Sequence, residues 1–148
     1  MKIGGAHIVF HRLLRTSKTT PHQVRAVLLT KRTWDAPMHP GYWGLVGGKV
    51  DSGESPRTAA IREAGEELGV TPVSMRFLCD VQVDHGGRKA LGVKYFSAPL
   101  NRDMDKLTPG RNPEDGKVEA EGIGWFSAEE MHHIVVRPED RIAISTFF

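Results

Sequence analysis

Two short apolar runs near the start of the chain combine β-prone residues with partial alternation. The first extends from Ile3 to Leu14 and the second from Val24 to Thr30, with a short polar connector between them. In the first run, alternate positions form two groups: Ala6, Ile8 and Phe10, against His7, Val9 and His11. This pattern predicts two strands, and the short connector predicts that they pair with each other.

The middle of the chain predicts a loop, a short strand and one strong helix. Trp34–Gly44 is rich in proline and glycine and reads as a loop, and a short strand is expected around Leu45–Val46. The helix is expected from Ser55 to Leu68, with Ser55 as its cap, Pro56 in its first position and Gly69 as its end. Its expected apolar stripe consists of Ala60, Ile61, Ala64 and Leu68.

The C-terminal half predicts further strands around a long polar loop. Val73–Val83 and Leu91–Ala98 read as strands joined by a turn at 85–87, and Val118–Phe126 is expected to return to the sheet after a loop at 99–117. A loop of this length is often functional, and its role stays open here. Ser127–Glu130 has the pattern of a capping box that opens a short helix, and Pro138 is expected to open a last helix. The mixture predicts an α/β or α+β sandwich.

Composition narrows the class of protein without identifying a function. The 148 residues suit one domain, and the formal charge of +2 favours neither a nucleic-acid polymer nor a membrane as partner. A small nucleotide is compatible with this charge. Cys79 is the only cysteine, so no internal disulfide forms, and it is expected to be a small buried apolar residue. The N-terminal apolar run is interrupted by charged and polar residues, which favours a cytoplasmic protein.

Three glutamates crowd one face of the predicted helix. Glu63, Glu66 and Glu67 are spaced i, i+3, i+4, which places them within about 100° of arc. Carboxylates at this spacing repel one another by a few tenths of a kcal/mol per pair, and the helix dipole does not favour anions in this part of the helix. A divalent cation reverses the argument, because Mg²⁺ binds hard oxygen ligands and bridges carboxylates to phosphates.

The residues around this face complete the pattern. The Gly47–Gly48 pair allows the backbone to approach a ligand, and Gly48 can offer a carbonyl to a cation. Glu54 adds a carboxylate ahead of the helix, and Arg62 stands four residues before Glu66, where it can pair with that side chain and orient it. Each feature alone is commonly structural; the specificity lies in their combination.

The segment from Gly48 to Val70 resembles the Nudix box at every specified position. The box reads glycine, five residues, glutamate, seven residues, then Arg-Glu-aliphatic-any-Glu-Glu-any-Gly-aliphatic. Weaker likeness extends to the lead-in Tyr42–Gly48, where Val46 stands in the place of a common proline, and to Trp125–Phe126 before an acidic helix. The resemblance implies an α/β/α sandwich with a mixed sheet between helices, in a single domain spanning residues 1–148.

The resemblance also implies roles for individual residues. Glu63, Glu66 and Glu67, together with the Gly48 carbonyl, are expected to bind Mg²⁺, with Mn²⁺ as an alternative. Arg62 matches the arginine that orients the glutamates, and Glu54 is expected to support the loop or an outer metal shell. Which glutamate acts as the general base varies within the family and stays open.

Residues outside the box are expected to complete the site. A further carboxylate is expected before Trp125; Glu119 is preferred because it lies six residues earlier, with Glu121 as the alternative. Arg32, at the end of the second strand, is expected to contact phosphates together with Gly47 and Gly48. The base is expected to stack on an aromatic side chain; the choices are Phe10, Trp34, Trp43 and Phe126.

The implied activity is Mg²⁺-dependent hydrolysis of a phosphoanhydride in a nucleoside diphosphate derivative. The downstream markers of the ADP-ribose and dinucleoside polyphosphate branches are absent: Gly86 and Gly87 stand in those regions. This favours a MutT-like nucleoside triphosphate pyrophosphohydrolase that releases a monophosphate and pyrophosphate. ADP-ribose, sugar nucleotides and dinucleoside polyphosphates stay as alternatives, as does a non-catalytic module that binds a nucleotide. Family members often dimerise, so a homodimer is one expected assembly.

Overall fold

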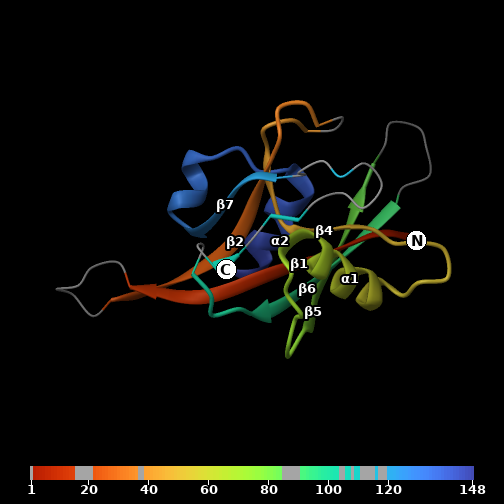
Figure 1. Ribbon diagram of the computed structural model, residues 1–148, viewed down its shortest axis with the longest axis horizontal. Helices are drawn as coiled ribbons and strands as arrows, with labels where there is room; N and C mark the ends of the chain where they lie inside the picture. Colours follow the sequence, from red (N-terminus) through yellow and green to blue (C-terminus); the bar gives the residue numbers. More distant parts are fainter. Residues whose placement is uncertain are drawn as a thin grey trace.

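The computed structural model describes residues 2–15, 22–36, 39–84, 91–103, 106–107, 109–110, 116 and 120–148. Within these residues seven strands form one mixed sheet, which lies between two α-helices (Figure 1). The elements in chain order are β1 (Lys2–Arg15), β2 (Gln23–Arg32), β3 (Trp43–Gly44), β4 (Val46–Lys49), α1 (Pro56–Leu68), β5 (Arg76–Val83), β6 (Leu91–Pro99), β7 (Ala120–Ser127), the 3-10 helix η2 (Glu130–His133) and α2 (Pro138–Phe147).

The sheet is organised around β1. At its C-terminal end β1 pairs antiparallel with β2, as the sequence predicts, and at its N-terminal end it pairs antiparallel with β4. Its other edge pairs in parallel with β6, while β2 also pairs with β3 and β7. The chain therefore crosses from the β2 side to the β1 side at Leu45, between β3 and β4.

The alternation in β1 separates two hydrophobic cores. Ala6, Ile8 and Phe10 are fully buried on the face covered by α1, and Val9 is fully buried on the face covered by α2. This part of β1 is apolar at successive positions because both faces of the strand are covered. The predicted α/β/α sandwich is confirmed.

The local signals predicted α1 correctly at both ends. Ser55 Oγ accepts a hydrogen bond from Thr58 N–H at 3.1 Å, Pro56 is the first helical residue and Gly69 forms the left-handed C-cap. The predicted apolar stripe is wrong at Ile61, which is 41% exposed, while Ala59 is buried instead. Small side chains at 59, 60 and 64 face the sheet, so the helix is rotated away from Ile61.

Other boundaries differ from the sequence prediction. The expected loop Trp34–Gly44 ends in β3, and the strand expected from Val73 begins only at Arg76, with Val73 63% exposed. Cys79 is half-buried rather than buried. The turn expected at 85–87 lies outside the described residues.

The C-terminal elements follow their local signals. Ser127 and Glu130 form the reciprocal hydrogen bonds of a capping box ahead of η2, and Pro138 begins α2. Among the described residues, no helix is long and apolar enough to cross a membrane. From the expected loop at 99–117, Leu100 and Leu107 are buried in the core under α1, and Gly110 N–H donates to the Glu67 carbonyl at 2.6 Å. Gly110 therefore lies against the end of α1 that carries the glutamates.

Candidate functional site

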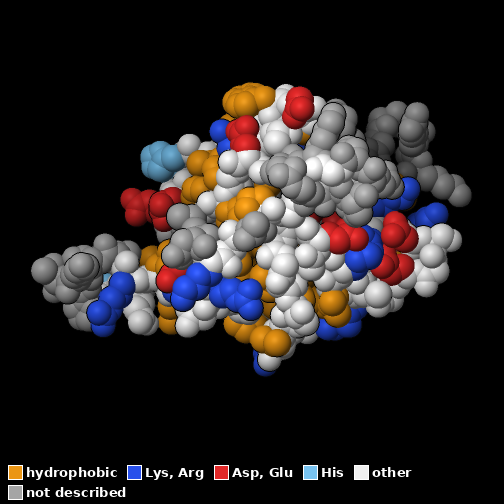
Figure 2. Space-filling model, viewed as in Figure 1, with side chains coloured by type: hydrophobic (Ala, Val, Ile, Leu, Met, Phe, Trp, Pro, Cys, Tyr) orange, Lys and Arg blue, Asp and Glu red, His pale blue; other side chains and the backbone are white. Residues whose placement is uncertain are grey.

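Arg62 on α1 is the centre of a network of carboxylates. Its guanidinium lies 2.9 Å from Glu54, 3.0 Å from Glu63, 3.2 Å from Glu66 and 3.4 Å from Asp51, and it also donates to the Lys49 carbonyl at 3.0 Å. The predicted pairing of Arg62 with Glu66 is confirmed. One cation thus holds four carboxylates, and Figure 2 shows acidic and basic side chains gathered in this region.

The contacts fix the charge states within this network. The hydrogen bond that Arg62 donates to Glu54 raises the pKa of Arg62 above its ordinary value; burial lowers it by a smaller amount, and the hydrogen bond to Glu63 raises it further. The hydrogen bond from Arg62 lowers the pKa of Glu54, and the Asp51 backbone N–H adds to this effect. Both groups stay charged across the physiological range, and the network places four carboxylates around one guanidinium.

Two helix carboxylates lie against the Gly47–Gly48 segment. Glu67 Oε2 accepts a hydrogen bond from Gly47 N–H at 3.2 Å. A β-carbon on Gly48 would collide with the carboxylate of Glu63, so only glycine allows this close approach. Gly47 has a φ of +154°, and a β-carbon there would collide with the Ala6 carbonyl of β1. The two glycines therefore bring β4 next to both α1 and β1.

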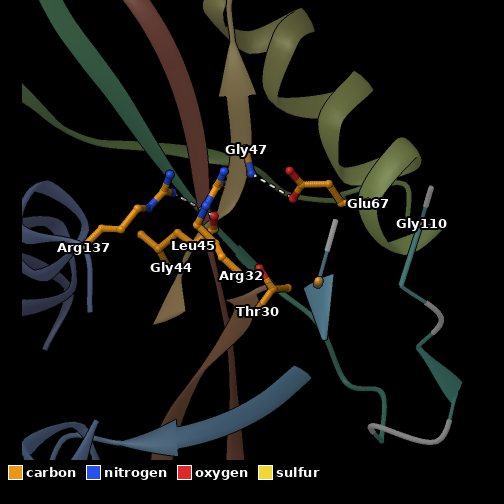
Figure 3. Close-up of a pocket in the computed structure, with 9 residues that line it drawn as sticks. Thr30, Arg32, Gly44, Leu45, Gly47, Glu67, Gly110 and Arg137 are labelled. Atoms are coloured by element: carbon orange, nitrogen blue, oxygen red, sulfur yellow. Dashed lines mark hydrogen bonds between the residues drawn. The ribbon is translucent and has the colours of Figure 1, made fainter. Parts of the chain in front are cut away.

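A cleft opens beside these glycines, between β2, β4 and the two helices. Thr30 and Arg32 of β2 line it together with Gly47 and Glu67 (Figure 3). The rest of the lining comprises Gly44, Leu45, Gly110, Ala120 and Arg137. Figure 3 shows Glu67 and Arg137 projecting toward the Leu45–Gly47 backbone from opposite sides, with Arg32 near the middle. The cleft therefore combines a carboxylate end with guanidinium groups.

The donor atoms at the carboxylate end suit a hard divalent cation. Within the described ranges, no three His, Cys, Asp or Glu side chains converge into a ready-made metal site. Glu63 and Glu66 instead accept hydrogen bonds from Arg62, and Glu67 accepts one from Gly47 N–H. Mg²⁺ needs few protein carboxylates, because it keeps several waters and binds substrate phosphates. The Glu63 carboxylate fills the space that a side chain on Gly48 would take, so hard oxygen donors gather beside this backbone, and the donor set fits such an ion.

The remaining predicted site residues separate into two groups. Arg32 and Gly47 line the cleft, whereas Glu54 faces Arg62 and the Asp51 backbone and so supports the loop before α1. Glu119, the preferred extra carboxylate, lies outside the described residues. Its alternative, Glu121, forms an ion pair with Lys31 at 3.2 Å and does not line the cleft.

The aromatic residues expected to stack on the base lie in different environments. Phe10 is fully buried in the core, so it cannot stack on a ligand. Trp43 and Phe126 pack edge to face with ring centroids 4.9 Å apart in the core under α2. Trp34 is 72% exposed, and Lys31 lies over its ring.

Sequence reasoning missed a buried polar group on the α2 side of the cleft. Asp140 is fully buried and accepts hydrogen bonds from Tyr95, Arg137 and the Leu45 backbone N–H. His7 lies beside Arg137 and stacks on Tyr95. An acidic residue in the first turn of a helix looks like ordinary dipole compensation in sequence, so no local signal marked Asp140.

Comparisons with known proteins are consistent with this geometry. The family model described as NUDIX domain matches residues 13–147. A nucleoside triphosphate pyrophosphatase/Nudix hydrolase fusion protein of Bifidobacterium longum is 32% identical over 87 residues, which cover 59% of this chain and 18% of that protein. An uncharacterised Nudix hydrolase of Pseudomonas aeruginosa is 32% identical over 102 residues, which cover 64% of this chain and 60% of that protein.

A solved structure matches the whole fold. The crystal structure of a MutT NUDIX hydrolase from Burkholderia pseudomallei has a TM-score of 0.73 and 26% identity, and the match covers 100% of this chain and 99% of that one. The chain spans less than two thirds of the length of the two curated relatives, so these matches concern a domain within each.

Proposed function

Because the chain belongs to the NUDIX domain family, we propose that it hydrolyses a phosphoanhydride bond in a nucleoside diphosphate derivative. The favoured substrate is a nucleoside triphosphate, cleaved in the MutT-like manner to a nucleoside monophosphate and pyrophosphate. The Burkholderia neighbour, named a MutT hydrolase, supports this choice.

The observation that carries the proposal is the imbalance of charge at one end of the cleft. Arg62 is held by four carboxylates, and Glu67 adds a fifth on the same helix next to Gly47. A fold does not need such an excess, since carboxylates this close repel one another. A divalent cation offsets this charge and can bridge these carboxylates to the phosphates of a substrate.

The residues that would hold a cation are Glu63, Glu66, Glu67 and the Gly48 carbonyl. Mg²⁺ is favoured because all the ligands are hard oxygens, and Mn²⁺ is the alternative. When bound, such an ion neutralises phosphate oxygens and lowers the pKa of an attacking water. Arg62 orients Glu63 and Glu66 through its hydrogen bonds.

The protein groups around the cleft would position the substrate. Gly47 N–H keeps Glu67 directed toward the cleft, and Arg32 lies where it can contact phosphate oxygens. A glutamate takes the proton from the attacking water; Glu63, Glu66 and Glu67 are the choices. Glu119 is proposed as an additional ligand from the segment before β7.

The experiment is an assay of the purified protein with Mg²⁺ on four classes of nucleotide: nucleoside triphosphates, ADP-ribose, sugar nucleotides and dinucleoside polyphosphates. Phosphate released after pyrophosphatase treatment reports the cleaved bond. Glu67→Gln should lower turnover of the best substrate by about 10²-fold or more, the range for losing a group that handles the proton or the metal. Glutamine can still accept the Gly47 hydrogen bond, so the fold should persist.

Glu129→Gln is the matched control, because Glu129 is exposed in the turn before η2. This variant should keep wild-type turnover. Near-normal rates in Glu67→Gln would contradict the assignment of the site. Tight binding of a nucleotide without hydrolysis of any class would replace the hydrolase with a nucleotide-binding module.

A further inference from the structure

Arg137 closes the end of the cleft opposite to the glutamates. It precedes α2 and projects toward the Leu45 backbone from the side opposite Glu67 (Figure 3). Its side chain is only 14% exposed, yet it is one of the residues that line the cleft. A guanidinium in this place is a polar group that a ligand in the cleft would meet.

The orientation of Arg137 is fixed by a buried carboxylate. Its Nε and Nη2 atoms lie 2.9 Å and 2.7 Å from Asp140 Oδ2, and Asp140 is itself held by Tyr95 Oη at 2.6 Å and Leu45 N–H at 2.9 Å. Nη2 also approaches the Leu45 carbonyl and His7 Nδ1, each at 3.4 Å. A guanidinium fork bound on two nitrogens has little rotational freedom left.

The third nitrogen of the fork is available to a ligand. Within the described part of the chain, Nη1 of Arg137 donates no hydrogen bond, whereas Nε and Nη2 are engaged. Gly44 allows the guanidinium to pack against the backbone, because a β-carbon there would lie 2.6 Å from Arg137 Nε. Arg137 Nη1 is thus a donor held at this end of the cleft, over the backbone of Gly44, which has no side chain.

The charge of this end differs from that of a phosphate site. Asp140 neutralises Arg137 at close range, so the pair has no net charge to attract a full anion. Phosphate groups are better matched by Arg32, near the middle of the cleft, and by a cation at the glutamates. A neutral group with a hydrogen-bond acceptor is the better match for Nη1.

We propose that Arg137 contacts the nucleobase of the substrate and donates a hydrogen bond from Nη1 to an acceptor on the base edge. Asp140 is then a positioning residue, which acts through Arg137 and the Leu45 backbone. This inference rests on the proposed function in that it takes the ligand to be a nucleotide, but it requires only binding and not turnover.

The test compares the affinities of two ligands that differ by the base. A nucleoside 5′-monophosphate and ribose 5-phosphate are titrated into the protein with Mg²⁺ by isothermal calorimetry, with the base taken from the best substrate or, without turnover, each of the common bases. Arg137→Met should weaken the affinity for the monophosphate by about 10-fold or more, the range for a hydrogen bond from a charged donor. Its affinity for ribose 5-phosphate should stay within about 2-fold of the wild-type value.

Two further variants keep the result interpretable. Arg137→Met with Asp140→Asn removes both charges and leaves an acceptor for Leu45 N–H, so it should fold and show the same selective loss. Arg141→Met, in α2, is the matched control, because within the described residues Arg141 donates only to the Met131 and Ile134 carbonyls and does not line the cleft. It should bind both ligands as the wild type does.

Three results would overturn the proposal. Arg137→Met could lose affinity for both ligands equally, or Arg141→Met could lose as much affinity for the monophosphate as Arg137→Met does. The third result is a wild-type protein that does not bind the monophosphate more tightly than ribose 5-phosphate. A selective loss in Arg137→Met supports it even if no nucleotide is hydrolysed. Failure of the hydrolysis assay and failure of this inference are therefore separate results.

Discussion

Two arginine–carboxylate networks lie on opposite sides of the segment that joins β3 to β4. On the α1 side, Arg62 meets four carboxylates, and its side chain is 28% exposed. On the α2 side, Arg137 meets one carboxylate, Asp140, which is fully buried and receives hydrogen bonds on both oxygens. The first network is negative and partly exposed beside the cleft, whereas the second is neutral and largely buried, and only its Arg137 lines the cleft.

The difference indicates a division of labour. A charged side chain can be buried only when an opposite charge balances it and hydrogen bonds satisfy its polar atoms. The Asp140 network meets that condition. The Arg62 network could not be buried with its excess of carboxylates, and its place beside a cleft allows a ligand to complete it. We therefore expect changes to Asp140 and to its buried neighbours His7 and Tyr95 to act mainly on stability, and changes to Arg62 mainly on activity.

The largest effect on stability is expected for Asp140→Ala. It leaves Arg137 buried without its partner, and breaking a buried pair in this way costs about 3–5 kcal/mol. Urea denaturation measures the loss. Asp80→Ala is the matched control, since it breaks the partly exposed pair with Lys94 at 3.0 Å and should cost at most about 1 kcal/mol. Similar losses in both variants would refute the distinction between the networks.

The next effect is the pH dependence of stability that His7 causes. Burial lowers the pKa of His7 from 6.5 to about 4, with Arg137 adding to the lowering and Asp140 opposing it. Between these pH values the unfolded chain binds a proton that the folded protein does not, so stability falls as pH decreases through this window. The full contribution is about 3 kcal/mol.

Denaturation of His7→Gln between pH 7 and pH 4 tests this expectation. The variant should lose less stability over this range than the wild type, because the titrating group is gone. His132→Gln, a change of an exposed histidine in η2, should follow the wild-type pH dependence. An unchanged slope in His7→Gln would show that this histidine is not held neutral by burial.

A smaller loss of stability is expected for Tyr95→Phe. The hydroxyl donates to Asp140 at 2.6 Å in a fully buried place, and a hydrogen bond to a charged group contributes about 1.5–3 kcal/mol. Thermal or urea unfolding measures it. Tyr42→Phe removes a hydroxyl from a half-buried tyrosine and should be nearly neutral. If Tyr95→Phe were equally neutral, Asp140 would not depend on this donor.

The smallest effect on stability, and a large one on activity, is expected for Arg62→Met. The ion pairs of Arg62 are partly exposed and share one guanidinium, so together they should contribute about 1 kcal/mol, and the carboxylates left behind can turn toward solvent to relieve their repulsion. Loss of a residue that orients ligands lowers activity by about 10–100-fold. Arg57→Met, on the same helix, removes a hydrogen bond to the Met75 carbonyl and should keep full activity.

These two measurements on Arg62→Met separate the networks directly. Kinetics at saturating and limiting Mg²⁺ should show the loss of activity, and denaturation should show a nearly unchanged protein. A loss of stability as large as that of Asp140→Ala would mean that the Arg62 network is structural after all.

Local sequence determined the elements whose signals are short in range. Ser55, Pro56 and Gly69 fixed the ends of α1, Ser127 and Glu130 fixed the cap of η2, and the alternation of Ala6, Ile8 and Phe10 fixed the face of β1. The glutamate spacing and the fixed identities from Gly48 to Val70 likewise pointed to a phosphoanhydride site. Each of these signals lies within one continuous segment of the sequence.

Only the tertiary structure decided which side chains from distant segments meet. The rotation of α1 that exposes Ile61 follows from packing of small residues on the sheet, because a helical stripe in sequence fits more than one rotation. The Asp140 network joins residues from β1, β6 and α2 to the Leu45 backbone, across as many as 130 residues of sequence. No local pattern marks such contacts, since their energy comes from burial and pairing that exist only after the chain has folded.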